Sequence, residues 1–196
     1  MSAIRTFIAL PSSPELKNAL RKLQTSLIQE KADLKWDTPD KFHITVKFLG
    51  NVDLDRITEL SDSLTTVTSR MTAFRLVYNA VGAFPDLVHP KVIWAGAEMN
   101  ETLTSLHHGI ELACARLGFP TDTRAFHPHI TLGRVKGLTN LARLTAKVNS
   151  ISFEPTETAC SEVLLIKSEL RPTGSVYTTL NSFPLKAQSE LFHDRQ

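Results

Sequence analysis

The sequence has few cysteines and no long apolar run. Its 2 cysteines, Cys114 and Cys160, lie far apart, with neither metal-ligand spacing nor the pattern of a disulfide framework. No apolar stretch is long enough to span a bilayer. The first residues, MSAIRTFIALP, contain an apolar run too short for the core of a signal peptide. These absences predict a protein of the reducing cytoplasm that has no membrane partner.

The sequence also lacks a strong charge of either sign. Its formal net charge is only +2 over 196 residues, which excludes a polybasic nucleic-acid binder but leaves room for a local basic cleft. Apolar residues make up 42% of the chain and charged residues 21%, close to the averages of globular proteins. The length predicts one domain or two small lobes with a sizeable core.

Local periodicity predicts alternating strands and helices. Ser13 and Pro14 form the cap and first residue of a helix to about Glu30, with leucines at helical spacing. The predicted strands are 4–10, 41–50, 74–79, 91–98, the segment from 129, and segments near 151, 163–168 and 176–180. The further predicted helices are 53–69, 103–117 and 139–148, and residues 82–90 are predicted to form a loop. We expect a single bilobal domain over 1–186 and a loose polar tail over 187–196.

Two of the predicted strands carry the same four-residue pattern. HITV begins at His43 and HITL begins at His129, and in each the apolar residues alternate with His and Thr. Alternation places His and Thr on the face opposite the core. A lone strand histidine is usually a hydrogen-bonded surface residue, and threonine is common in strands. The repetition of the pair is what indicates chemistry.

The layout of the two halves repeats as well. A helix, a His-x-Thr strand and a second helix recur with an offset of about 86 residues. This predicts two α+β lobes related by an approximate two-fold axis, with His43 and His129 facing each other across a central groove.

Such a pair suits acid–base chemistry. Two histidines near the reference pKa of about 6.5 can hold opposite protonation states, so that one donates a proton while the other accepts one. The hydroxyls of Thr45 and Thr131 are neutral donors suited to the oxygens of a phosphate.

The paired motifs resemble those of the two-histidine (2H) phosphoesterase superfamily. The stretches IRTFIALP, HITVKFLG, HPKVIWAG, FHPHITLGRV and VYTTLNSFPL are similar to the RNA 2′,3′-cyclic phosphodiesterase branch, also described as 2′-5′ RNA ligase-like. The resemblance extends to about Leu185. It implies a bilobal α+β fold with antiparallel sheets around a groove, and a monomer acting on RNA with 2′,3′-cyclic phosphate ends or on small cyclic nucleotides.

The resemblance also implies the roles of individual residues. Hydrolysis of the cyclic phosphate to a 2′-phosphate would use neither metal nor cofactor. His43 would be the proton donor and His129 the proton acceptor. Thr45 and Thr131 would bind the phosphate oxygens, and Arg134 matches a position that is often basic in the family.

Alternation bears on two charged residues that follow the motifs. It places Arg134 on the face opposite His129, so that Arg134 could reach a phosphate only through a bulge, for example at Gly133. It places Lys47 on the His43 face, where the alternative is a solvated lysine at the end of the strand.

Two other functions compete with the acid–base pair. His127 and His129 form an H-x-H, with His107 and His108 earlier in the chain, but no carboxylate cluster at ligand spacing accompanies them. We therefore expect no metal, and His107 and His108 to be solvated on a helix. A groove that binds RNA ends or nucleotides without turnover is the non-enzymatic alternative.

Three further residues have ordinary interpretations. His89 is predicted to lie in a loop. Phe84 and Phe126 are expected in the core, with stacking on a nucleobase as the alternative.

Overall fold

Residues 3–172 and 174–187 are described by the computed structural model, and within them the chain forms nine strands and four α-helices. The strands are β1 (Ala3–Pro11), β2 (Leu34–Trp36), β3 (His43–Asp53), β4 (Phe74–Phe84), β5 (Val92–Ala97), β6 (His129–Val135), β7 (Thr156–Cys160), β8 (Glu162–Arg171) and β9 (Gly174–Pro184). The helices are α1 (Pro14–Ile28), α2 (Ile57–Thr68), α3 (Glu101–Arg116) and α4 (Leu141–Ser150). Two short 3₁₀ turns, Pro39–Lys41 and Leu54–Arg56, precede β3 and α2.

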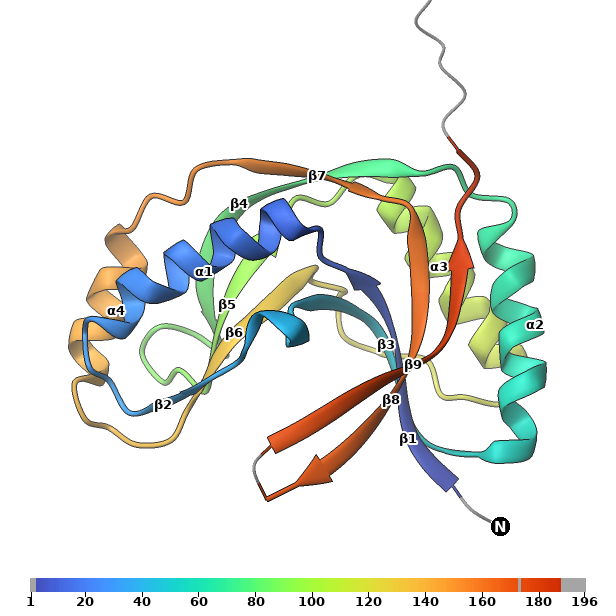
Figure 1. Ribbon diagram of the computed structural model, residues 1–196, viewed down its shortest axis with the longest axis horizontal. Coiled ribbons are helices and arrows are strands. Elements are labelled where there is room, and N and C mark those ends of the chain that lie inside the picture. Colours follow the sequence, from blue (N-terminus) through green and yellow to red (C-terminus); the bar gives the residue numbers. More distant parts are fainter. Residues whose placement is uncertain (1–2, 173, 188–196) are drawn as a thin grey trace, which may run out of the picture.

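All nine strands belong to one antiparallel sheet of order β7-β4-β5-β6-β3-β1-β8-β9, with β2 paired to β6. The sheet curls strongly, and the β8–β9 hairpin extends away from the helices (Figure 1). The two strands with the His-x-Thr pattern, β3 and β6, are neighbours at its centre. The α+β class predicted from the sequence is confirmed.

The helices lie in two pairs at opposite ends of the sheet (Figure 1). Helix α1 packs against α4, and α2 packs against α3. Each pair therefore combines one helix from the first half of the chain with one from the second. In the repeat predicted from the sequence, α1 belongs with α2 and α3 belongs with α4. In the structure, α1 packs instead against the second helix of the other half, and so does α3.

Helix α1 shows how local sequence forms these elements. The Ser13 hydroxyl accepts a hydrogen bond from the Leu16 amide at 3.2 Å, and Pro14 occupies the first helical position. Both features stabilise a helix start, because the first amides lack partners within the helix. The apolar stripe that was predicted from leucine spacing is buried, and the helix ends at Ile28, two residues before the predicted end.

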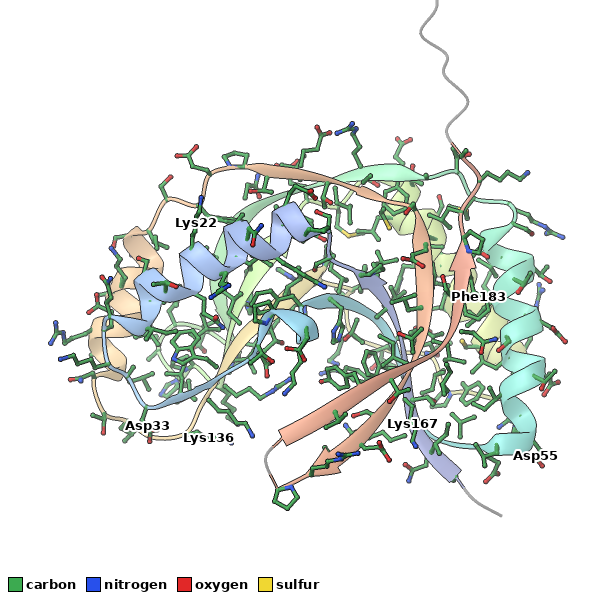
Figure 2. All side chains as sticks on the ribbon, in the orientation of Figure 1. Lys22, Asp33, Asp55, Lys136, Lys167 and Phe183 are labelled. Atoms are coloured by element: carbon green, nitrogen blue, oxygen red, sulfur yellow. The ribbon has the colours of Figure 1, made fainter. Side chains whose placement is uncertain are left out.

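The core lies between the sheet and its helices. One large cluster of buried apolar side chains fills this space, and a smaller one, formed by Phe7, Ala9 and Ile166, lies on the other face of the sheet. Phe183 of β9 is 4% exposed and points toward α2 (Figure 2). The face of the sheet that packs against the helices is the outer face, and the face that carries the smaller cluster is the inner face.

Several predicted boundaries were wrong. No strand forms at Ile151, and the strand of that region, β7, begins only at Thr156. Strand β2 was missed because three residues carry too little periodicity. Strand β3 begins at His43 because the residues before it form a 3₁₀ turn, and β4 continues to Phe84, into the predicted loop. Most of the predicted tail, residues 188–196, lies outside the described residues.

Candidate active site

The register between the two motif strands decides how the four polar side chains lie. Strands β3 and β6 are antiparallel, with Ile44 opposite Ile130. Both isoleucines are buried in the core, at 1% and 0% exposure. Alternation then turns the flanking His and Thr of each strand to the inner face. Because the strands are antiparallel, His43 lies on the Thr131 side and His129 on the Thr45 side.

All four side chains line one groove on the inner face of the sheet. Its volume is about 1170 Å³, and its walls come from β1, β3, β6, the β8–β9 hairpin and the segment before β6. The groove thus brings together His43, His129, Thr45 and Thr131, as the sequence predicted. The groove has room for a nucleotide, since typical ligand sites measure roughly 300–1,000 Å³.

Each motif strand has a β-bulge at the fourth residue of the motif. In β3, Ala9 pairs with Thr45 and Ile8 with Lys47, so that Val46 is the additional residue. In β6 the register skips Leu132 in the same way, between Thr131 and Gly133. A bulge puts one extra residue into a strand, so that the alternation beyond it changes phase.

This phase change brings Arg134 to the groove. Strict alternation would have pointed Arg134 to the opposite face, but the bulge turns it to the same face as His129 and Thr131. The corresponding residue of β3, Phe48, also lines the groove. Arg134 is exposed, and its charge lowers the pKa of both His43 and His129.

Lys47 belongs to the lining of the groove, as His43 does, but it is not the solvated lysine that was the alternative. Its side chain is only 3% exposed, and its ammonium group contacts Glu111 of α3 at 2.8 Å. It also donates to the carbonyl of Pro120 at 2.8 Å. The prediction of a solvated lysine was wrong, because the bulge at Val46 turns this side chain into the protein.

The His43 ring is enclosed by aromatic side chains. Phe7 of β1 stacks on it at 4.9 Å between ring centroids, and Tyr177 of β9 contacts it edge-on at 5.4 Å. Burial lowers the pKa of His43 to about 4, helped by the charges of His129 and Arg134 and opposed by a hydrogen bond to the backbone of Lys41.

The environment of His129 resembles that of His43, with one backbone hydrogen bond and aromatic contacts. Its Nδ1 lies 2.7 Å from the carbonyl oxygen of His127, and Phe84 of β4 contacts its ring edge-on at 4.8 Å. Burial lowers its pKa, and the hydrogen bond to His127 opposes that shift. An imidazole whose Nδ1–H donates to a carbonyl keeps its other nitrogen, Nε2, as the acceptor.

These shifts correct the expectation that both histidines titrate near 6.5. Both pKa values fall below that reference, so that His43 and His129 are neutral at pH 7 in the unliganded groove. Burial disfavours the charged form because the interior solvates an ion poorly. A bound anion reverses this effect, since a negative charge nearby favours the imidazolium.

The groove contains groups that the sequence did not reveal. Asp37, Lys41 and Arg5 line it near the β8–β9 hairpin, and Phe7 and Tyr177 form the wall beside His43. Burial raises the pKa of Asp37, and the charge of Arg134 opposes this. These residues come from separate parts of the chain, and no spacing connects them to the motifs.

The predictions for the remaining histidines and aromatic residues were only partly confirmed. His89 is in a loop and His108 is exposed, as predicted. His107 is half-buried and stacks on Phe126 at 4.2 Å, so its prediction as a solvated residue was wrong. Phe126 is half-buried and packs against the core while it lines the groove. Phe84 is also half-buried and lines the groove, but it contacts His127 and His129 and does not belong to the core, so its prediction as a core residue was wrong.

The H-x-H sequence does not assemble a set of metal ligands. His127 packs against Phe84 at 5.4 Å and Trp94 at 4.9 Å. Within residues 3–172 and 174–187, no group of three or more His, Cys, Asp or Glu side chains is arranged to hold a metal ion.

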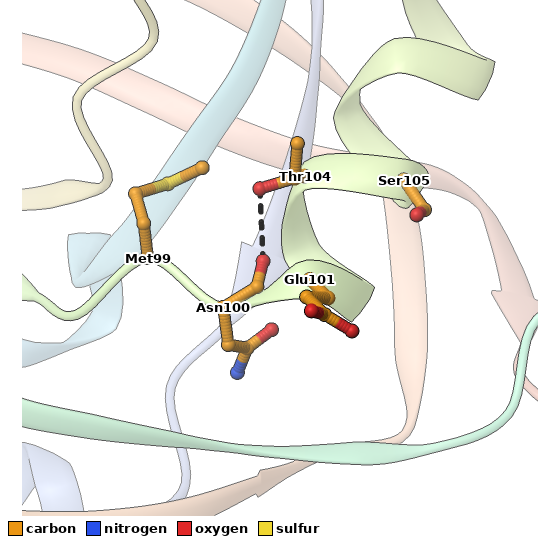
Figure 3. A pocket seen from close by; sticks show the side chains of 5 residues that line it. All are labelled: Met99, Asn100, Glu101, Thr104 and Ser105. Carbon is orange, nitrogen blue, oxygen red and sulfur yellow. Dashed lines mark hydrogen bonds between the residues drawn. The ribbon is translucent and has the colours of Figure 1, made fainter.

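A second hollow lies at the start of α3 (Figure 3). There Asn100 caps the helix, accepting from the Leu103 amide at 2.8 Å and from the Thr104 hydroxyl at 2.9 Å. The two oxygens of Asn100 therefore serve the helix, and its side-chain amide donates to the Arg75 carbonyl of β4 at 2.9 Å. Within the described part of the chain, no helix is both long and apolar enough to cross a membrane.

Comparison with known proteins gives consistent matches along the whole fold. The family of LigT-like phosphoesterases matches residues 10–94 and 96–177. The chain is 29% identical to an RNA 2′,3′-cyclic phosphodiesterase of Methanothermobacter thermautotrophicus, covering 93% of this chain and 99% of the relative. It is 30% identical to a protein of the same name from Aeropyrum pernix, covering 87% and 96%.

A solved structure agrees with these matches. The crystal structure of TT0787 from Thermus thermophilus superposes with a TM-score of 0.79 at 26% identity, covering 95% of this chain and 100% of that one. The family match spans most of the chain, including both His-x-Thr motifs and Arg134. The chain belongs to the LigT-like phosphoesterase family.

Proposed function

We propose that this protein hydrolyses the 2′,3′-cyclic phosphate at RNA ends, or of small cyclic nucleotides, to a 2′-phosphate. The observation that carries the proposal is the pairing of Ile44 with Ile130. This single register point puts two imidazoles and two hydroxyls on one face of neighbouring strands. The substrate class follows from the relatives, several of which are named RNA 2′,3′-cyclic phosphodiesterase.

The reaction needs a base and an acid on opposite sides of phosphorus. In the proposed mechanism Nε2 of His129 takes a proton from water as the water oxygen bonds to phosphorus. The bond from phosphorus to the 3′ oxygen breaks, and His43 gives its proton to that oxygen. The product has a 2′-phosphate and a 3′-hydroxyl, and solvent restores the two protonation states.

The charge of the substrate favours the state in which one histidine is protonated and the other is neutral. Both histidines are neutral at pH 7 in the unliganded groove because burial lowers their pKa values. A cyclic phosphodiester carries one negative charge, which favours protonation of one imidazole as it binds. Arg134 and the two threonine hydroxyls would hold the phosphate oxygens, where charge increases in the transition state.

The groove is complete within one chain, which supports action as a monomer. All four motif side chains and Arg134 come from the same β3–β6 pair. The two cysteines are unpaired and buried, which is compatible with a reducing cytoplasm, the proposed location.

The test is turnover of a 2′,3′-cyclic mononucleotide in the presence of EDTA. Phosphorus NMR should show the cyclic phosphate converted to a 2′-phosphate monoester. Binding without turnover would support the non-catalytic alternative. Loss of activity in EDTA, with recovery on adding a divalent metal, would contradict the two-histidine mechanism.

A further inference from the structure

The buried Lys47 has no role in the proposed chemistry. All the hydrogen-bond donors of its ammonium group nevertheless have partners within the protein. Its Nζ contacts both oxygens of Glu111, at 2.8 and 2.9 Å, and the carbonyl of Pro120 at 2.8 Å. An ammonium group has three protons, and these three acceptors use all of them. Lys47 therefore has no donor left for a phosphate.

A buried ion pair is a poor means of stabilising a fold. Taking both charges out of water costs about as much as their attraction returns, so that apolar replacements of similar size are often tolerated. What distinguishes this pair is its third partner. Pro120 belongs to residues 117–128, the segment that connects α3 to β6 and lines the groove from position 120 to 127.

Other contacts hold the same segment. Arg56 donates to the Leu117 carbonyl, and its guanidinium lies 4.7 Å from the centre of the Phe119 ring. Near the other end, His107 of α3 stacks on Phe126 with an interplanar angle of 7°. Its Nε2 also lies 4.0 Å from Glu111.

The segment ends at the carbonyl that orients His129. Phe126, held by His107, is followed directly by His127, whose carbonyl oxygen lies 2.7 Å from Nδ1 of His129. Pro128 is held in turn, because its carbonyl accepts from the Ala97 amide at 3.0 Å.

We propose that Lys47, Glu111 and His107 are positioning residues that hold the 117–128 segment, so that the His127 carbonyl keeps Nε2 of His129 directed into the groove. The proposal rests on the proposed function, because it explains how the base of that reaction is oriented. It also connects the two motifs, since Lys47 directly follows the first motif and acts on the histidine of the second.

The decisive variant removes both charges together. Lys47→Met with Glu111→Leu replaces the ion pair by apolar side chains of similar size, which avoids leaving one charge buried alone. We expect a folded protein whose kcat falls about ten- to a hundredfold, since small displacements of a reacting group have effects of this size. KM for a cyclic mononucleotide should change little.

A matched control removes an ion pair elsewhere. Arg75 and Glu157 form a cross-strand pair at 3.1 Å between β4 and β7, and neither lines the groove. Arg75→Met with Glu157→Leu should leave kcat unchanged. Thermal unfolding of both double variants separates lost stability from lost activity.

A second pair of variants tests the stacked contact. His107→Ala removes the ring over Phe126, and we expect a severalfold lower kcat, whereas His107→Phe keeps a flat ring there and should restore it. Nitrogen NMR of the His129 ring supplies a direct readout. The wild type should show the tautomer protonated at Nδ1, and the Lys47/Glu111 double variant should show a mixture of tautomers.

The outcomes separate the two proposals. If the wild type turns over cyclic phosphate but a stable Lys47/Glu111 double variant does so at the wild-type rate, with an unchanged His129 tautomer, the positioning role is wrong. Absence of turnover by the wild type would overturn the proposed function instead, and the tautomer measurement would still report on the positioning.

Discussion

The two motif strands are alike up to their fourth residue and different beyond it. In both, an apolar residue between His and Thr points into the core, and a bulge occurs at the fourth position. In both, the histidine is held by the backbone two residues earlier, at Lys41 for His43 and at His127 for His129.

The fifth and sixth positions differ. The fifth is Lys47 in β3, which reaches α3, and Gly133 in β6, where a Cβ would lie 2.8 Å from the ring of Trp36. The sixth is Phe48 in β3 and Arg134 in β6, and both line the groove.

This comparison separates what the chemistry needs twice from what it needs once. The acid and the base need equivalent, opposed positions, which a repeated strand provides. A cation for the phosphate is needed on one side only. The close approach of β2 at Gly133 and the ion pair at Lys47 are likewise used once each.

The largest predicted effect tests the equivalent positions. His43→Ala and His129→Ala should each lower kcat about 10²–10⁴-fold, the usual contribution of positioned proton transfer. The double variant should lose much less than the product, because the pair acts as a unit. His108→Ala, an exposed histidine on α3, is the control. Near-normal turnover in either single variant would contradict the mechanism.

A modified substrate can assign the two roles. With sulfur in place of the 3′ bridging oxygen, the leaving thiolate needs less help from an acid, since a thiol has a pKa of about 8.5. His43→Ala should then recover most of its lost rate relative to wild type, and His129→Ala should not. The reverse result would exchange the two assignments.

Substitutions at the sixth positions, Arg134 and Phe48, should have unequal effects on turnover. Arg134→Ala should lower kcat/KM about ten- to 150-fold, which corresponds to the roughly 1.5–3 kcal/mol of a hydrogen bond to a charged group. Arg134→Lys should recover part of this, because it keeps the charge but not the planar fork. Phe48→Ala on the opposite strand is the matched variant and should retain kcat for a mononucleotide. Equal losses at both positions would mean that the cation has no special role.

Substitutions at the third positions, Thr45 and Thr131, should have equal and smaller effects on turnover. Thr45→Ala and Thr131→Ala should each slow turnover about ten- to a hundredfold with the fold intact, because each removes one donor to the phosphate. Thr→Ser at the same positions keeps the hydroxyl and is the control. Unchanged turnover in both alanine variants would show that the threonines serve only the strands.

The smallest effect is a shift in pH dependence. Both histidine pKa values lie below 6.5 in the unliganded groove, so the singly protonated pair is most abundant on the acid side of that value, and kcat/KM should be greatest there. Bound substrate is anionic and raises both pKa values, so the optimum of kcat should lie at higher pH. Two coinciding profiles, with optima above pH 7, would contradict the burial effect.

Proton NMR of the imidazoles provides an independent measurement. Adding a nucleoside 2′-phosphate should raise the pKa of His43 above its unliganded value of about 4. The exposed His89 serves as the internal reference, because it lies outside the groove.

Local sequence was enough for most of the helices and for the two motif strands. The Ser13 cap, the leucine stripe of α1 and the His-x-Thr alternation are relations between neighbouring residues, so they can be recognised without knowing what packs against them. The repeat of about 86 residues indicated the pairing of the two motifs in the same way.

The tertiary structure decided the rest. The bulges at Val46 and Leu132 depend on the register with adjacent strands, and they turn Lys47 toward α3 and Arg134 to the groove. The packing of α1 against α4 and of α3 against α2 depends on how the whole sheet curls. The low pKa of His43 depends on its enclosure, to which rings from β1 and β9 contribute. Each of these is set by residues distant in sequence, because register, burial and electrostatics arise only when separate segments pack together.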